Sequence, residues 1–123
     1  MHRSRLAGII IDCENANLPE AASFWSAALG MPSAGQEPNY IGLDGSARDV
    51  TVEVQSVKHP SRVHLDIESD DVEAEAKRLE ALGAKRVEKI KTWVVLEAPT
   101  GQRFCVIRAK RSLEGAAGAQ VWP

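Results

Sequence analysis

The amino-acid sequence predicts an α+β fold of two β-α-β-β-β modules, at about residues 5–57 and 61–108, in one domain of residues 1–111. Three observations support this prediction. The two halves repeat the same order of strand-like and helix-like segments. Each helix-like segment ends in Leu-Gly, at Leu29-Gly30 and Leu82-Gly83. A length of 123 residues suits a single domain. A ferredoxin-like sandwich with extra strands is the alternative.

The clearest pattern lies in the segment Ser61–Val87. Three apolar residues alternate with three polar ones here, as in a strand with one buried and one polar face: Val63, Leu65 and Ile67 with His64, Asp66 and Glu68. Asp70 follows as a candidate helix N-cap, with Glu73 able to reach back to it. The apolar residues of this helix predict that it covers the apolar side of the strand and leaves the side of His64 free.

The first half shows the same signals. The apolar run Leu6–Ile11 predicts a central strand covered on both faces. A helix is expected to begin at Asn17, with Glu20 three residues on, and to end at Gly30. The remaining expected elements are a loop with at most a short edge strand at Met31–Asn39, strands Tyr40–Leu43 and Val50–Val57 joined by a turn at Asp44–Arg48, and strands Lys85–Ile90, Thr92–Glu97 and Arg103–Ile107.

The last residues, 112–123, are rich in Gly and Ala and have no period, so we expect a flexible tail unless Trp122 packs against the domain. The net charge of −2 gives no field that would attract nucleic acid or an anionic membrane. No apolar run approaches the roughly 20 residues of a membrane span. Cys13 and Cys105 have no close spacing, which fits a reducing cytoplasm. We therefore expect a cytoplasmic protein with neither a nucleic-acid nor a membrane partner.

Three segments, in this order along the chain, resemble a known superfamily: IIIDCENANLPEAASFWSAALG, RVHLDIESDDVEAEAKRLEALGAKRV and WVVLEAPTGQRFCVI. The sequence resembles the vicinal-oxygen-chelate superfamily of glyoxalases, bleomycin-resistance proteins and extradiol dioxygenases, and more narrowly its small glyoxalase-like domains. The resemblance implies that the two modules form a mixed sheet that curls around a cleft, and that the protein is a homodimer.

Metal enzymes of this superfamily place ligands on the first and last strands of each module. By position, the resemblance assigns His64, Glu53 with Gln55 as a rival, Arg5 and Cys105 to these places. A guanidinium stays protonated and cannot ligate a cation, and it would repel one, so we expect no metal. Arg5 would instead pair with Glu53 or bind an anionic ligand group. If a divalent ion (Zn, Ni, Fe or Mn) is bound, the resemblance implies that His64, Glu53 and Cys105 hold it.

The resemblance implies that the protein handles a small molecule. The candidate binding residues are Arg5, Gln55, His64, Asp66, Trp93 and Cys105, and the best candidates for catalysis are Glu53 and His64. A metal-dependent lyase or dioxygenase, a resistance protein that sequesters a small molecule, and a dimerising scaffold are the alternatives, so enzymatic activity stays open. At single positions, His64 could equally be hydrogen-bonded on a polar sheet face, and Cys105 could be a small buried core residue.

Overall fold

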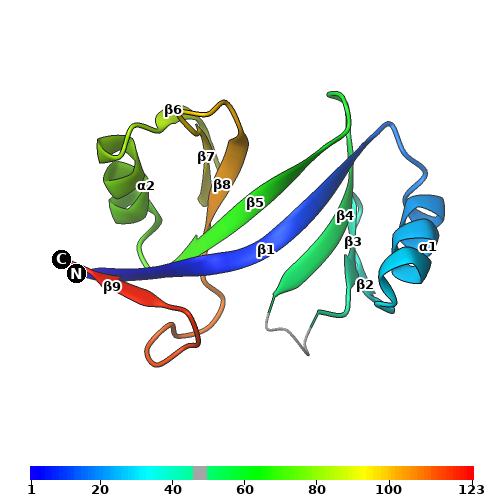
Figure 1. Cartoon of the computed structure of the whole chain (residues 1–123), viewed down its shortest axis with the longest axis horizontal. Coiled ribbons are helices and arrows are strands. Elements are labelled where there is room, and N and C mark those ends of the chain that lie inside the picture. The colour runs from blue at the N-terminus through cyan, green and yellow to red at the C-terminus, as the bar shows by residue number, and fades with distance from the viewer. Residues whose placement is uncertain (46–49) are drawn as a thin grey trace. The chain divides into compact units, whose positions relative to one another are not determined.

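The structure is a computed structural model that describes residues 1–45 and 50–123. Within these residues it has two helices and a large mixed sheet that does not close, which confirms the predicted α+β class (Figure 1). The elements are β1 (His2–Glu14), α1 (Leu18–Leu29), β2 (Ser33–Gln36), β3 (Tyr40–Leu43), β4 (Thr51–Val57), β5 (Arg62–Ser69), α2 (Val72–Ala81), β6 (Lys85–Ile90), β7 (Trp93–Glu97), β8 (Arg103–Arg108) and β9 (Gln120–Trp122).

The chain divides into two compact units. The N-terminal unit is Gly8–His64, and the C-terminal unit combines Met1–Ala7 with Leu65–Pro123. β1 and β5 therefore each contribute residues to both units. The predicted turn at Asp44–Arg48 falls mainly on residues 46–49, which lie outside the described residues.

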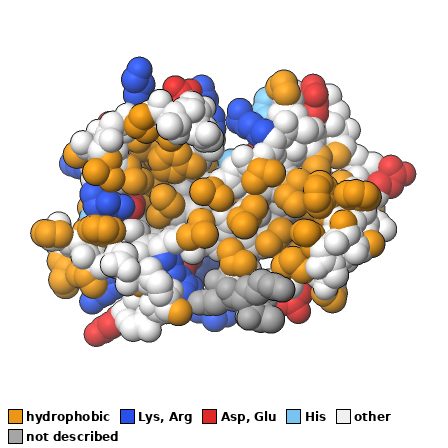
Figure 2. Space-filling model, viewed as in Figure 1, with side chains coloured by type: hydrophobic (Ala, Val, Ile, Leu, Met, Phe, Trp, Pro, Cys, Tyr) orange, Lys and Arg blue, Asp and Glu red, His pale blue; other side chains and the backbone are white. Residues whose placement is uncertain are grey.

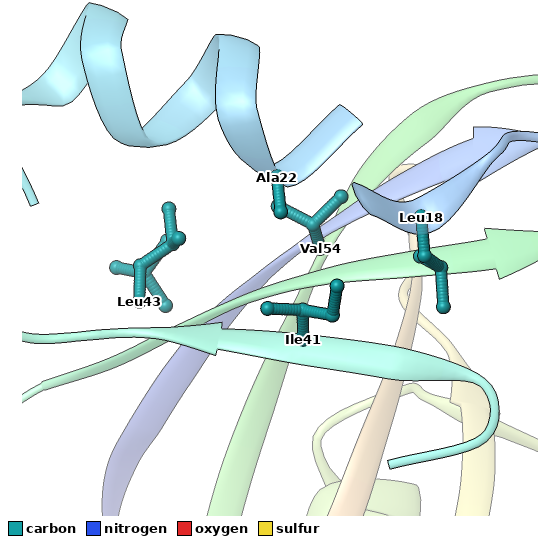
Figure 3. Packing of buried hydrophobic residues seen from close by; sticks show 6 residues of the cluster. Leu18, Ala22, Ile41, Leu43 and Val54 are labelled. Carbon is teal, nitrogen blue, oxygen red and sulfur yellow. The ribbon is translucent and has the colours of Figure 1, made fainter. Parts of the chain in front are cut away.

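In the N-terminal unit the strands are ordered β2-β3-β4-β1, with β1 parallel to β4. Helix α1 covers one face of this sheet and packs on alternate residues of β3 and β4. Figure 3 shows this core, which consists of Leu18, Ala22, Ile41, Leu43, Val52 and Val54. The helix begins where predicted, because the Asn17 side chain accepts a hydrogen bond from the Glu20 N–H. It ends at Gly30, whose φ of 67° favours glycine.

In the C-terminal unit the order is β5-β8-β7-β6, with β5 parallel to β8. Helix α2 packs on the buried residues Val94, Leu96 and Val106 through Ala76. Its N-cap is Asp71 and not the predicted Asp70, since the Asp71 carboxylate accepts from the Ala74 N–H at 3.0 Å. Asp70 instead accepts a hydrogen bond from the Arg3 backbone N–H at 2.7 Å. The long-range bond to β1 is the reason that the cap moves by one residue.

The end of the chain is another difference from the sequence expectation. Strand β9 pairs antiparallel with the beginning of β1, so that the two termini lie side by side (Figure 1). Trp122 donates a hydrogen bond from Nε1 to Ser4 Oγ at 2.9 Å, and the Arg78 guanidinium lies 3.8 Å above its ring. Trp122 therefore packs against the domain. This is the condition under which the sequence analysis did not expect residues 112–123 to form a flexible tail.

Several expected core residues are exposed. Apolar and polar residues alternate in β5, and the apolar side was predicted to be buried. That prediction is wrong at Val63, which is 58% exposed, and at Leu65, which is 47% exposed. Within the C-terminal unit, helix α2 contacts β6, β7 and β8. Leu6 is 49% exposed, so β1 is not covered on both faces along its whole length. Hydrophobic side chains are accordingly visible on the surface drawn in Figure 2.

Candidate functional site

The predicted site residues are divided between the two units. Glu53, Gln55 and His64 belong to the N-terminal unit. Arg5, Asp66, Trp93 and Cys105 belong to the C-terminal unit. Each group is described within its own unit.

Within the described residues of the N-terminal unit, α1 is the helix that packs on the sheet, and it covers one face. Val52 and Val54 pack under α1, so Glu53 and Gln55 point to the opposite face, as the alternation predicted. In the β1–β4 register Glu53 is paired with Ile10, and Gln55 with Asp12. We call this surface the open face of the N-terminal unit because α1 packs on the other face, although Ile10 and Asp12 on it are buried.

Tyr40 of β3 is paired with Gln55 and adds a phenol to this face. Burial, then the charge of Glu53 and then that of Glu37, raise the pKa of Tyr40. The phenol therefore stays protonated at neutral pH and can donate a hydrogen bond. The sequence analysis did not include Tyr40 among the candidates.

Asp12 and His64 form the centre of the open face. The Asp12 side chain is only 1% exposed, and its Oδ2 lies 2.7 Å from Nδ1 of His64. Because an ionised carboxylate only accepts hydrogen bonds, Nδ1 carries the proton and Nε2 is left as the acceptor of the neutral ring. The other oxygen of the carboxylate, Asp12 Oδ1, is buried and has no hydrogen-bond partner within the described part of the chain.

Two further side chains lie close to the same oxygen. His59 Nε2 is 3.9 Å and Arg62 Nε is 4.0 Å from Asp12 Oδ2. Arg62 and His64 are two residues apart in β5, so they share one side of the strand. The structure thus brings one buried carboxylate, two imidazoles and one guanidinium together in the N-terminal unit.

The sequence analysis selected His64 but missed Asp12, His59 and Arg62. A signal was present for two of them, since Asp12 ends an apolar run and Arg62 shares the period-two alternation with His64. Nothing local showed that Asp12 would lie against His64, because 52 residues separate them.

In the C-terminal unit Arg5 forms an ion pair with Glu68, with 2.6 Å between Nε and Oε1. It also donates from Nη1 to the Ala117 carbonyl at 3.0 Å. Glu68 was not considered as a partner from the sequence. Asp66 and Cys105 face each other in the β5–β8 register, and both are half-buried. Trp93 begins β7 and is half-buried as well.

A second buried carboxylate lies in the C-terminal unit. Glu75 is fully buried and accepts hydrogen bonds from His2 Nε2 at 2.8 Å and from Arg78 Nε and Nη2, each at 2.8 Å. Burial raises the pKa of Glu75, but the hydrogen bonds from Arg78, His2 and Ser4 outweigh it, so that the pKa lies below its ordinary value. This carboxylate is ionised and fully paired.

Away from these clusters, a surface hollow of about 660 Å³ lies beside α1. Its lining has no ionisable side chain and consists of Pro19, Ala22, Ser23, Ser26, Ala27, Ser33, Gly35, Gln36 and Ile41. It could hold a neutral group, but it has no residue suited to acid–base or metal chemistry.

The comparisons with known proteins agree with this fold. The family model for the glyoxalase-like domain matches residues 8–107. The chain belongs to this family. It is thereby a member of the vicinal-oxygen-chelate superfamily, as the sequence resemblance indicated. A comparison with curated proteins found no match.

Solved structures show the same fold at low sequence identity. Methylmalonyl-CoA epimerase from Mycobacterium tuberculosis has a TM-score of 0.69 and 15% identity, over 91% of this chain and 92% of the epimerase. A hypothetical protein from Bacillus halodurans has a TM-score of 0.70 and 12% identity, over 89% and 96%. An extradiol ring-cleaving dioxygenase from B. fuscum has a TM-score of 0.60 and 14% identity, over 85% of this chain but 32% of the dioxygenase. These likenesses establish the glyoxalase-like fold alone.

A remaining structural question concerns membranes. Among the described residues, neither helix has the length and apolar character needed to cross a bilayer.

Proposed function

We propose that this glyoxalase-like protein binds a small molecule on the open face of the N-terminal unit, and that His64 Nε2 accepts a proton or a hydrogen bond from it. The observation that carries the proposal is the 2.7 Å contact between His64 Nδ1 and the buried carboxylate of Asp12. That contact fixes both the orientation of the ring and the nitrogen that carries the proton.

The rest of the open face suits this role. The His64 side chain is 14% exposed, so the ring is largely shielded from water. Gln55 and Tyr40 can hydrogen-bond polar groups of a ligand beside it. If the ligand carries an acidic proton, His64 acts as a general base. If it does not, the same residues bind and sequester the ligand, as in a resistance protein.

A metal-dependent lyase or dioxygenase is the second candidate, and one observation favours it. A histidine whose Nδ1 donates to a carboxylate is the common arrangement of a metal-ligating histidine. His64 Nε2 and a carboxylate oxygen of Glu53 would hold a divalent ion, which would supply Lewis-acid activation of a bound oxygen. An imidazole and a carboxylate are ligand types that such ions accept, and Arg5, whose charge argued against a metal, is paired with Glu68. Cys105, the third predicted ligand, belongs to the C-terminal unit.

Ligand screening tests the proposal. A library of small polar compounds is screened by thermal shift against the wild type, His64→Gln and Ser23→Ala. Ser23 lies in the hollow beside α1 and is the control, since ligands of that hollow would respond to it. We expect compounds whose affinity falls about tenfold or more in His64→Gln, as for loss of a hydrogen bond to a charged or strongly polar group, and not in Ser23→Ala. Ligands that respond only to Ser23→Ala, or an absence of ligands, would contradict the proposal.

Elemental analysis separates the two candidates. After reconstitution with Zn²⁺, Ni²⁺, Fe²⁺ or Mn²⁺, a stoichiometric ion that is lost in both His64→Gln and Glu53→Gln supports the metal enzyme. A protein that binds its ligand without a stoichiometric ion supports binding or general-base chemistry at His64.

The proposal extends to assembly and location. We expect a homodimer in the cytoplasm, on the resemblance to the superfamily and on the cysteine usage. Sedimentation equilibrium tests the dimer, and a monomer at micromolar concentration would contradict it.

A further inference from the structure

We propose that Arg62, held by His59 and Asp12, binds a carboxylate group of the ligand, so that the protein takes small organic acids. This inference names the ligand class of the proposed function and therefore rests on it. It depends on the contacts of His59 and Arg62, which the sequence analysis did not consider.

The hydrogen bonds of His59 determine which of its nitrogens carries the proton. Nδ1 lies 2.9 Å from the Pro60 carbonyl oxygen, which only accepts, so Nδ1 is the donor. Nε2 lies 3.3 Å from Nη2 of Arg62, which only donates, so Nε2 is the acceptor. His59 Nε2 thus anchors one nitrogen of the guanidinium.

A second nitrogen of the guanidinium is held by charge. Arg62 Nε lies 4.0 Å from Asp12 Oδ2, an ion-pair distance without a hydrogen bond. Asp12 is buried, and His64 already donates to the same oxygen. The guanidinium is therefore fixed at two points while its side chain remains 45% exposed. A pre-oriented, partly exposed guanidinium is well suited to bidentate pairing with a carboxylate.

The charges of this cluster determine how tightly we expect it to bind a carboxylate. The charges of Arg62 and Asp12 have opposite signs and cancel, so this pair sets up no strong field for anions in general. Recognition then depends on directed N–H bonds, which favours a planar carboxylate over a diffuse anion. We expect a simple carboxylate to bind weakly, with a Kd of about 1 mM or higher.

The position of Arg62 also limits the shape of the ligand. Arg62 Nε and His64 Nδ1 both lie within 4.0 Å of the same oxygen of Asp12. A carboxylate on Arg62 would therefore place the neighbouring carbon and its substituents close to His64. A hydroxyl group there can donate to Nε2, so a 2-hydroxy acid uses both residues, whereas acetate uses only Arg62.

Histidine NMR tests the inference, because the chain has three histidines and His2 is buried in the C-terminal unit. The imidazole C–H signals are followed while sodium acetate or sodium glycolate is added at constant pH and ionic strength, with sodium chloride as the blank. We expect the signals of His59 and His64 to move and that of His2 to stay. We also expect glycolate to bind more tightly than acetate by about threefold or more, as for one additional hydrogen bond.

Substitutions identify the residue that is responsible. Arg62→Gln should weaken acetate about tenfold or more, and Arg62→Lys, which keeps the charge but not the planar fork, should recover part of the loss. Arg103→Gln is the matched control, since Arg103 is also a partly exposed, ion-paired arginine. Histidine signals that do not move in the wild type, or an equal loss in Arg103→Gln, would overturn the inference.

The variant His64→Gln separates this inference from the proposed function. If Arg62 is the carboxylate subsite, acetate still shifts the His59 signal in His64→Gln, even where screening rejects a role for His64. If the acetate effect disappears with His64 and persists in Arg62→Gln, the subsite is wrong and His64 alone recognises the ligand.

Discussion

The two buried carboxylates of this protein differ in how completely they are paired. Glu75 receives hydrogen bonds from His2, Arg78 and Ser4, and both of its oxygens are used. Asp12 receives one from His64 through Oδ2, while Oδ1 has no partner among the described residues. Each carboxylate lies against an imidazole, so a buried Asp or Glu beside a histidine does not by itself indicate a functional site.

The imidazoles beside the two carboxylates differ in their exposure to solvent. His2 is 5% exposed and enclosed by its own network, whereas the His64 side chain is 14% exposed and half-buried on a sheet face without a helix. A fully satisfied network contributes mainly to stability, and an incompletely satisfied one is the better candidate for function. We therefore expect stability to depend on Glu75 and ligand chemistry to depend on Asp12.

The largest expected effect is on stability. Glu75→Ala leaves Arg78 and His2 without their shared partner, so we expect the free energy of unfolding in urea to fall by about 3 kcal/mol. The control is Glu73→Ala on the same helix, an exposed residue paired with Arg86, which should cost less than about 1 kcal/mol. Equal losses in the two variants would remove the distinction between the networks.

An intermediate effect should appear in acid. Since the pKa of Glu75 is lowered in the folded protein, its contribution to stability is present above its ordinary pKa of 4.5 and is lost as the pH falls below that value. The free energy of unfolding should decrease from about pH 5 downwards, and this decrease should be shallower in Glu75→Gln. The measurement is a series of urea titrations between pH 3 and 7. An unchanged slope in the variant would show that other carboxylates cause the acid dependence.

The smallest expected effect concerns the charge of Asp12. Burial and then the charge of Asp12 raise the pKa of the Cys13 thiol. In a Cys105→Ser background, Asp12→Asn should therefore increase the rate at which iodoacetamide alkylates Cys13 at pH 8, by a few-fold at most because burial remains. The rate is measured by mass spectrometry. An unchanged rate would show that burial alone, and not the charge of Asp12, governs the reactivity of Cys13.

Local patterns were sufficient for much of the fold. The cap at Asn17 and the stop at Gly30 depend on residues within one helical turn, and the alternation of Glu53 and Gln55 with two buried valines depends on one strand. Long-range packing decided the rest. The pairing of Asp70 with Arg3 moved a helix cap, and Val63 and Leu65 are exposed although their strand alternates.

The candidate site was harder to predict for the same reason. His64 could be selected from its strand and from the resemblance, but its partner Asp12 belongs to another strand. Arg62, the first residue of β5, donates a hydrogen bond to His59, which precedes the strand. No spacing rule indicates such a contact, because it depends on the path of the chain around Pro60.

Strand β9 protects the sheet at a point where β1 would otherwise be an edge. β4 pairs with β1 only from Gly8 onward, and β9 covers His2, Arg3 and Ser4. Removing residues 120–122 would expose backbone N–H and C=O groups of His2 and Ser4, whereas those of Arg3 stay bonded to Ser69 and Asp70, and would offer a template to a strand of another molecule. A carboxyl-terminal truncation should therefore promote self-association and aggregation, so the end of the chain matters for handling the protein in solution.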